Sequence, residues 1–114
     1  MNIRVICKKV PKLVINYNNQ YEIINKFYDY NNKLRENVES YKGYIKSESY
    51  YNSNLFNYKD TNIDMILTVS EWETNEDMNN WFISNIRNNI FNKYKNIIEK
   101  EEIYIIKKED IFLL

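Results

Sequence analysis

The stretch that decides the fold runs from Ser40 to Tyr94. It begins as SYKGYIKSESYYN (residues 40–52) and, after a polar segment, continues as DMILTVSEWETNEDMNNWFISNIRNNIFNKY (residues 64–94). Gly43, the only glycine of the chain, opens one predicted strand, because it can adopt the positive φ of a tight turn at little cost. A second predicted strand follows and ends in Glu-Trp-Glu, and a helix begins directly after it.

Alternating side chains indicate the strands. The clearest is Ile63 to Trp72, which places Ile63, Met65, Leu67 and Val69 on one face and Ile66, Thr68, Ser70 and Trp72 on the other. We also predict strands at Tyr44 to Tyr51, at Ile3 to Val10, where Pro11 ends the run, and at Glu102 to Lys108. The segment from Asn52 to Asn62 is rich in turn-forming residues and is predicted to be an exposed loop, and a short tail follows the last strand.

Apolar residues three and four apart predict two helices. From about Gln20 to Val38 the apolar face comprises Ile23, Ile24, Phe27, Tyr30, Leu34 and Val38. The second helix is predicted to start after Thr74, which with Glu76 and Asp77 resembles a capping box. Its apolar side comprises Met78, Trp81, Phe82, Ile86, Ile90, Tyr94, Ile97 and Ile98.

The order of these elements is β-α-β-β-α-β, which is typical of a ferredoxin-like α+β sandwich. At 114 residues the chain is expected to form one domain, residues 1–114. Two helices would cover one face of a four-stranded antiparallel sheet. The other face, if it carries aliphatic residues, would bind a ligand, a nucleic acid or a second copy of the chain.

Composition excludes several classes of function. Lysine plus arginine equals aspartate plus glutamate, 16 each, so the basic excess of a nucleic-acid-binding protein is missing. No apolar run is long enough for a transmembrane helix, and no signal peptide is recognisable, so we expect neither. Cys7 is the only cysteine, which excludes an intramolecular disulfide and fits a reducing cytoplasm.

Histidine is absent from the chain. This excludes Ser-His-Asp and Cys-His catalysis, zinc bound by histidine, and haem bound by a proximal histidine. With a single glycine, neither a GxGxxG loop nor a P-loop is possible. No cluster of metal ligands is evident, so no metal site is expected. Any chemistry must use carboxylates, tyrosine, tryptophan, lysine, arginine, amides or a cofactor.

The chain resembles the antibiotic biosynthesis monooxygenase superfamily, the small dimeric α+β-barrel proteins. The resemblance rests on three segments in order: Lys42-Gly43-Tyr44-Ile45 with Glu48, Thr68-Val69-Ser70-Glu71-Trp72-Glu73, and Asn75-Glu76-Asp77-Met78-Asn79-Asn80-Trp81 with Ser84 and Arg87. It implies a homodimer in which two sheets pack face to face, and a pocket in each subunit between the sheet and the helices. It also implies a small-molecule ligand. The charge balance and the lack of a long apolar run lead us to expect neither a nucleic acid nor a membrane as partner.

The same resemblance implies either no cofactor or haem. Some members are cofactor-free oxygenases of aromatic polyketides, others degrade haem, and many have no known activity. Trp81 is similar to a tryptophan that contacts the porphyrin in the haem-degrading branch. That branch places its haem-ligating histidine near Phe91 of this chain, where no histidine is available, and its first-strand asparagine near Cys7 or Lys8.

Trp81, Arg87 and Glu48 are the candidate catalytic residues. Trp81 would stack on a flat ligand, Arg87 would hold a carboxylate or an enolate-like anion, and Glu48 would accept a proton if burial raised its pKa. Tyr44, Tyr94 and Phe91 are, with Trp81, the candidate ligand-binding residues. Each has a structural alternative: core packing for the aromatic residues, ion pairing at the surface for Arg87, and cross-strand pairing with lysine for Glu48.

Three functions remain open from the sequence. The first is a monooxygenase-like enzyme acting on a flat aromatic or hydrophobic molecule, in which the deprotonated substrate would itself reduce O₂. The second is a dimeric ligand-binding protein without turnover, whose pocket would hold haem or another hydrophobic metabolite. The third is an RNA-recognition module, suggested by Lys42-Gly43-Tyr44-Ile45 but opposed by Lys46, which stands where an aromatic residue is wanted, and by the net charge of zero.

Overall fold

The computed structural model describes residues 2–12, 17–53 and 63–106. Four strands form one sheet: β1 (Ile3–Pro11), β2 (Tyr44–Ser53), β3 (Ile63–Trp72) and β4 (Ile98–Ile106). The helices are α1 (Tyr17–Val38), α2 (Asn75–Phe82), α3 (Asn85–Tyr94) and the 3₁₀ turn η1 (Lys95–Ile97). The predicted loop between Asn52 and Asn62 lies largely outside the described residues, as does the tail from Lys107.

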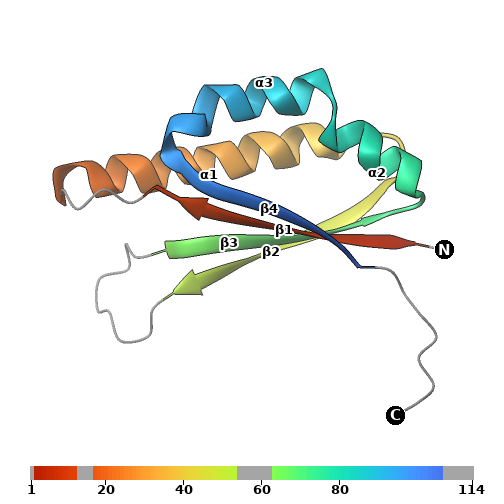
Figure 1. Cartoon of the computed structure of the whole chain (residues 1–114), viewed down its shortest axis with the longest axis horizontal. Helices are drawn as coiled ribbons and strands as arrows, with labels where there is room; N and C mark the ends of the chain where they lie inside the picture. Colours follow the sequence, from red (N-terminus) through yellow and green to blue (C-terminus); the bar gives the residue numbers. More distant parts are fainter. Residues whose placement is uncertain (1, 13–16, 54–62, 107–114) are drawn as a thin grey trace, which may run out of the picture.

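The sheet has the strand order β2-β3-β1-β4, and all of its neighbours are antiparallel. The three α-helices lie on one face of this sheet, and within the described residues no helix covers the opposite face (Figure 1). This is the ferredoxin-like α+β architecture that the order of elements predicted. No helix in the described part of the chain is long and apolar enough to cross a membrane.

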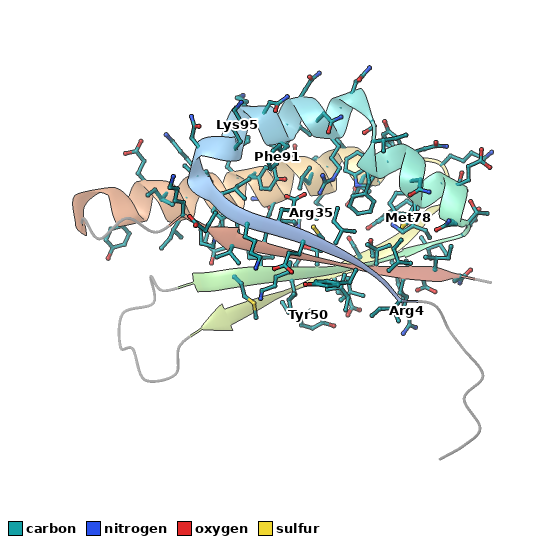
Figure 2. The ribbon with its side chains drawn as sticks, viewed as in Figure 1. Arg4, Arg35, Tyr50, Met78, Phe91 and Lys95 are labelled. Carbon is teal, nitrogen blue, oxygen red and sulfur yellow. The ribbon has the colours of Figure 1, made fainter. Side chains whose placement is uncertain are left out.

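The core lies between the helices and the inner face of the sheet. The main cluster contains Val5, Tyr30, Leu34, Val38, Trp72, Met78, Trp81 and Tyr94, and a smaller one contains Ile24, Phe27 and Ile66. Met78 and Phe91 lie in this layer, whereas Tyr50 extends from the opposite face of the sheet (Figure 2). The inner and outer faces of β3 are those that its alternation predicted, since Ile66, Ser70 and Trp72 are buried.

Gly43 forms the turn between α1 and β2 and has a φ of 82°. The main-chain N–H of Glu73 donates to the carbonyl oxygen of Gly43 at 2.8 Å, which ties this turn to the end of β3. A Cβ at this position would collide with the side chain of Asp77 on α2. Both the backbone angle and the close approach of α2 therefore require glycine here.

The second predicted helix is in fact two helices, and this prediction was wrong. α2 ends at Phe82, and Ser84 begins α3 by accepting a hydrogen bond at its Oγ from the Arg87 N–H, 3.2 Å away. Serine is a preferred N-cap because its side chain satisfies an otherwise unpaired N–H of the first turn. The apolar spacing runs through this break, so spacing alone does not reveal it.

The last strand also begins earlier than predicted. β4 starts at Ile98, so Ile98 belongs to the strand and Ile97 to the 3₁₀ turn η1, and neither is part of an α-helix. Pro11 pairs with Ile98 at a register shift in the sheet, and the Lys12 N–H donates to the Ile97 carbonyl oxygen at 2.7 Å. These pairings extend β4 toward the helix by four residues relative to the predicted start at Glu102.

Candidate functional site

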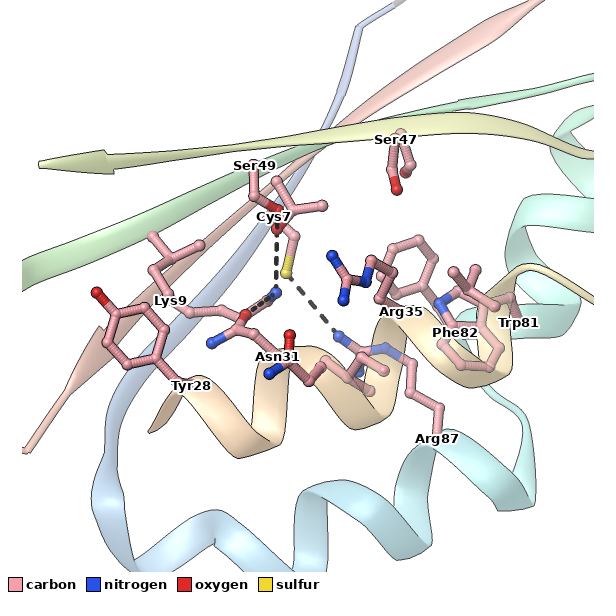
Figure 3. A pocket seen from close by; sticks show the side chains of 16 residues that line it. Cys7, Lys9, Tyr28, Asn31, Arg35, Ser47, Ser49, Trp81, Phe82 and Arg87 are labelled. Carbon is pink, nitrogen blue, oxygen red and sulfur yellow. Dashed lines mark hydrogen bonds between the residues drawn. The ribbon is translucent and has the colours of Figure 1, made fainter. Parts of the chain in front are cut away.

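A cavity with a volume of about 270 Å³ lies between the inner face of the sheet and the helices. Residues from β1, β2, β3, α1, α2 and α3 line it, and Figure 3 shows several of them. The exposed lining residues, Asn32 and Arg35 on α1 and Ser49 on β2, mark its mouth. Small-molecule sites commonly have volumes of about 300 to 1,000 Å³, so this cavity lies just below the lower end of that range and suits a small ligand.

Lys9 forms the floor of the cavity. Alternation along β1 points Val5, Cys7 and Lys9 toward the helices, and Lys9 is only 4% exposed. Its Nζ donates to Asn31 Oδ1 at 2.6 Å and to Thr68 Oγ1 at 3.2 Å. Burial lowers the pKa of Lys9 from its usual 10.5, because the charged form loses its hydration.

Arg87 reaches the cavity from the first turn of α3 (Figure 3). Its guanidinium forms a buried ion pair with Glu101 of β4, and Glu101 also accepts a hydrogen bond from Tyr30 OH at 2.6 Å. Burial acts to lower the pKa of Arg87, but the opposite charge of Glu101 holds it above its usual value, so the guanidinium stays charged. Its Nε has no hydrogen-bond partner among the described residues.

Cys7 lies beside both cations. Its Sγ is 3.9 Å from Arg87 Nη2, and its thiol is buried. Burial raises the pKa of the thiol, and this effect exceeds the opposing attraction of Lys9 and Arg87. Since the thiolate is the reactive form, Cys7 packs as a small apolar residue rather than acting as a nucleophile.

Trp81 and Phe82 form an apolar wall at the C-terminal end of α2. The Trp81 ring makes an edge contact with Tyr41, with ring centroids 4.8 Å apart, and Trp81 is 4% exposed. The Arg87 guanidinium carbon lies 4.7 Å from the centroid of the Phe82 ring. A flat ligand in the cavity would therefore contact aromatic surface on one side and charged groups on the floor.

The charge of the lining has one sign. Lys9, Arg35 and Arg87 line the cavity, and no aspartate or glutamate does so among the described residues. Arg35 has no ion-pair partner in the described part of the chain, and Figure 3 shows its guanidinium extending from α1 toward the interior. This arrangement favours a ligand that carries, or develops, negative charge.

The structure brings together two of the residues proposed from the sequence, Trp81 and Arg87. On a single ideal helix, six residues would separate them by roughly 240°. The break at Ile83 and Ser84 changes the direction of the chain, so both side chains line the same cavity. The surface ion pair offered as the alternative for Arg87 is instead a buried one, with Glu101.

Glu48 and Tyr44 do not line this cavity. Glu48 is on the outer face of β2, exposed, and accepts a hydrogen bond from Tyr50 OH at 2.5 Å. Tyr44 packs edge-on against Trp72, with centroids 5.6 Å apart, and its OH is 2.7 Å from Ser47 Oγ. The register of β2 explains the position of Glu48, because Ser47 and Ser49 occupy the inward positions on either side of it.

Tyr94 and Phe91 also lie away from the cavity lining. Tyr94 is buried against Tyr30, with centroids 5.6 Å apart, and its OH donates to Asp29 Oδ2 at 2.5 Å. Phe91 is partly buried and contacts the edge of the Tyr30 ring at 6.5 Å between centroids. Both side chains occupy the layer between α1 and α3.

Lys9, Asn31 and Glu101 are the polar residues of the site that the sequence did not single out. Lys9 follows Lys8, and two adjacent lysines are typical of an edge strand whose side chains are exposed to water. The alternation of side chains along a strand could have shown this. Val5 and Cys7 are apolar and face the helices, and the same alternation places Lys9 on that face. A charged side chain on the buried face of a strand is unusual, and that could have identified it.

The cavity residues do not fit a haem group of the kind bound by the haem-degrading branch. The chain has no histidine, and Phe91, near the expected ligand position, packs in the core. Cys7 is a sulfur donor, but its raised pKa disfavours the thiolate that binds haem iron. Within the described residues, no three side chains from histidine, cysteine, aspartate and glutamate converge to hold a metal ion.

No protein-family model and no curated protein matches the sequence. Solved structures nevertheless share its fold. A proposed antibiotic biosynthesis monooxygenase from Deinococcus radiodurans has a TM-score of 0.70 at 7% identity, covering 98% of this chain and 97% of that chain. SnoaB, a cofactor-independent oxygenase from Streptomyces nogalater, has TM-scores of 0.62 and 0.60 in two crystal structures at 6% identity, covering 96% and 95%.

A third similar structure is a dimeric protein of unknown function with a ferredoxin-like fold, from Bacteroides fragilis. It has a TM-score of 0.65 at 12% identity and covers 94% of this chain and 96% of that chain. At such low identities the likeness establishes the fold. This chain has the ferredoxin-like fold that antibiotic biosynthesis monooxygenase-like proteins also have, as the resemblance in its sequence predicted.

Proposed function

We propose that the protein is a monooxygenase-like enzyme that acts, without a bound cofactor, on a flat and weakly acidic aromatic molecule. The observation that carries this proposal is that two buried basic residues, Lys9 and Arg87, line the same cavity as the aromatic side chains of Trp81 and Phe82. Similarity in fold to a cofactor-independent oxygenase supports the reaction class. The substrate is bound, deprotonated and then oxidised by O₂.

Lys9 is the proposed proton acceptor. Its pKa is lowered by burial, so a larger fraction of the amine is neutral near neutral pH than for an exposed lysine. Arg87, which stays charged because of Glu101, stabilises the resulting substrate anion. Trp81 holds the ring system in place, as the sequence analysis proposed for it.

The electrons for O₂ come from the substrate. For an activated methylene group, loss of a proton gives a carbanion that adds to O₂, and the resulting hydroperoxide loses water to leave a carbonyl. One oxygen atom enters the product and the other becomes water, so no external reductant is required. The protein supplies the proton acceptor, the stabilising charge and a site with restricted access to water.

A homodimer is part of this proposal. The outer face of the sheet carries Ile6, Val10, Met65, Leu67 and Val69, and no helix covers it (Figure 1). Pairing two such faces would bury this apolar surface, and the ferredoxin-like protein from Bacteroides fragilis is dimeric.

The test uses a hydroxylated anthrone as substrate, with O₂ uptake followed by electrode and the quinone by absorbance. We expect one O₂ consumed for each substrate molecule, faster than in buffer, and a loss of about 100-fold or more in Lys9→Met, since that is the usual contribution of a general base. Lys8→Met is the matched control and should retain the rate, because Lys8 lies on the outer face of β1.

A second candidate is a ligand-binding protein without turnover. The hydrogen bonds within the floor favour it, because Lys9 is already held by Asn31 and Thr68, and Arg87 by Glu101. Tight binding of the anthrone with O₂ uptake equal to that in buffer would support this function and contradict the oxygenase.

A further inference from the structure

Lys9 is a buried lysine without a carboxylate partner. Fully buried lysines in proteins are rare and are normally paired with an acid. Among the described residues, none of the ion pairs includes Lys9, and both acceptors of its hydrogen bonds are neutral. A charged ammonium in this place therefore lacks compensation by a direct counter-ion.

The hydrogen bonds of Lys9 suit a neutral amine. A neutral amine has two N–H bonds and one lone pair, and the two acceptors, Asn31 Oδ1 and Thr68 Oγ1, account for both N–H bonds. Asn31 is itself fixed, since its Nδ2 donates to the Phe27 carbonyl oxygen at 2.7 Å. The third tetrahedral position of Nζ is then left for the lone pair.

The groups around Lys9 come from four elements. Cys7 lies on the same strand, Arg87 on α3, Glu101 opposite on β4, and the Tyr30 ring of α1 has its centroid 6.0 Å from Nζ. Burial is the largest cause of the lowered pKa of Lys9 and Arg87 adds to it, while Cys7 and Glu101 act in the opposite direction. Desolvation beside a second cation is the setting in which lysine amines become nucleophilic.

The cavity gives a ligand access to this amine. Lys9 lines the same cavity as Trp81 and Phe82, and the mouth of this cavity lies between α1 and β2. Figure 3 shows the Lys9 side chain extending along the cavity floor between Tyr28 and Asn31. A planar molecule on the aromatic wall would bring its substituents toward the floor.

From this arrangement we propose that Lys9 is a nucleophilic amine that forms an imine with a small planar aldehyde or ketone bound in the cavity. The evidence is the burial of Lys9, its two neutral hydrogen-bond acceptors and its position in the lining of the cavity that Trp81 and Phe82 also line. The inference does not depend on the oxygenase reaction, because condensation with a carbonyl needs neither O₂ nor a redox partner.

The step balances without other reactants. The lone pair of Nζ attacks the carbonyl carbon and forms a C–N bond, and the carbonyl oxygen takes up a proton to give a carbinolamine. The hydroxyl group then leaves as water, so both amine hydrogens and the carbonyl oxygen depart together, and a C=N bond remains. When the imine nitrogen is protonated, it carries one N–H, which can donate to Asn31 Oδ1.

The experiment measures which lysine reacts first. The intact protein is incubated at neutral pH with benzaldehyde and sodium cyanoborohydride, which reduces the imine to a stable amine, and labelled peptides are quantified by mass spectrometry over time. We expect labelling at Lys9 to be at least about tenfold faster than at Lys95, an exposed lysine of η1 that lies away from the outer face of the sheet, because an ordinary lysine is almost wholly protonated at this pH.

Two controls make the result decisive. In urea-unfolded protein the preference for Lys9 over Lys95 should disappear. In Lys9→Met the fast labelling phase should be lost while labelling of the other lysines is unchanged. Equal or slower labelling of Lys9 in the native protein would overturn the inference without bearing on O₂ uptake. Fast labelling with no O₂ uptake would retain it and remove the proposed oxygenase.

Discussion

At the scale of single residues, the chain buries two basic side chains, and only one of them has a carboxylate partner among the described residues. Arg87 is matched by Glu101, so it stays charged and its pair is costly to break from one side. Lys9 has only neutral partners, so the cost of its burial falls on the charged form. This difference lets one site hold a fixed positive charge and a proton acceptor side by side.

The lowered pKa of Lys9 predicts a pH-dependent stability. Between its folded pKa and the usual 10.5, the unfolded chain binds one proton more than the folded chain, so the contribution of Lys9 to stability rises with pH and is lost as pH falls. We therefore expect the unfolding free energy of the wild type, minus that of Lys9→Met, to rise as the pH increases toward 10.5, by at most about 1.4 kcal/mol per pH unit.

Urea unfolding of both proteins across this pH range would measure the difference. Lys8→Met serves as the control and should run parallel to the wild type, because Lys8 lies on the outer face of β1. A difference between wild type and Lys9→Met that stays flat with pH would mean that Lys9 remains protonated in the folded protein.

At the scale of elements, the junction of α2 and α3 builds the site. Ser84 ends one helix and starts the next, and the Arg87 N–H is the donor that its side chain caps. Residues that spacing assigns to different faces of one helix thereby line one cavity. The capping hydrogen bond thus fixes both the direction of α3 and the position of the guanidinium.

Ser84→Ala should lower the unfolding free energy by about 1 kcal/mol, the usual value of an N-cap hydrogen bond, as measured by urea unfolding. Ser40→Ala is a matched control: Ser40 is exposed, and its Oγ donates to the Asn37 carbonyl oxygen at 3.1 Å near the end of α1. Its change should stay within about 0.5 kcal/mol. Equal effects of the two substitutions would show that the cap does not hold α3.

The sequence predicts the elements that have one dominant period. β3 and α1 match because alternation and three–four spacing are uninterrupted in them, and both are buried on the predicted side. The break between α2 and α3 is not predicted from the sequence, because apolar residues from Met78 to Ile90 keep the helical spacing across Ser84. The roles of Lys9 and Glu101 are not predicted for another reason. They depend on partners from distant segments of the chain, which local patterns do not reveal: Asn31 and Thr68 for Lys9, and Arg87 for Glu101.

At the scale of the whole molecule, one face of the sheet is covered by helices and the other is not (Figure 1). The uncovered face carries Ile6, Met65, Leu67 and Val69 among charged residues such as Lys8 and Glu48. Lys8 pairs with Leu67 and Glu48 with Val69, so charged side chains alternate with the apolar ones, and a group of uncovered aliphatic side chains is typical of a surface that binds a protein partner. Two copies of this face are self-complementary if a two-fold axis relates them.

Light scattering after size exclusion should therefore give about twice 14.0 kDa for the wild type. Leu67→Lys places a charge at the centre of the outer face and should shift the mass to that of a monomer, with the circular dichroism spectrum retained. Ile83→Lys, at a residue 72% exposed on the helical side, should remain dimeric. A wild-type monomer, or a Leu67→Lys dimer, would contradict pairing through the sheet.

The division between α2 and α3 also bears on how this protein could be re-engineered. The aromatic wall belongs to α2 and the guanidinium to α3, each helix with its own N-cap, Thr74 and Ser84. Shape selectivity can therefore be altered at Trp81, whereas a change at Phe82 would also remove a contact of the Arg87 guanidinium. In laboratory evolution, the two properties could be changed independently. Libraries on α2 would select for the shape of the substrate, and libraries around Arg87 and Glu101 would select for its acidity.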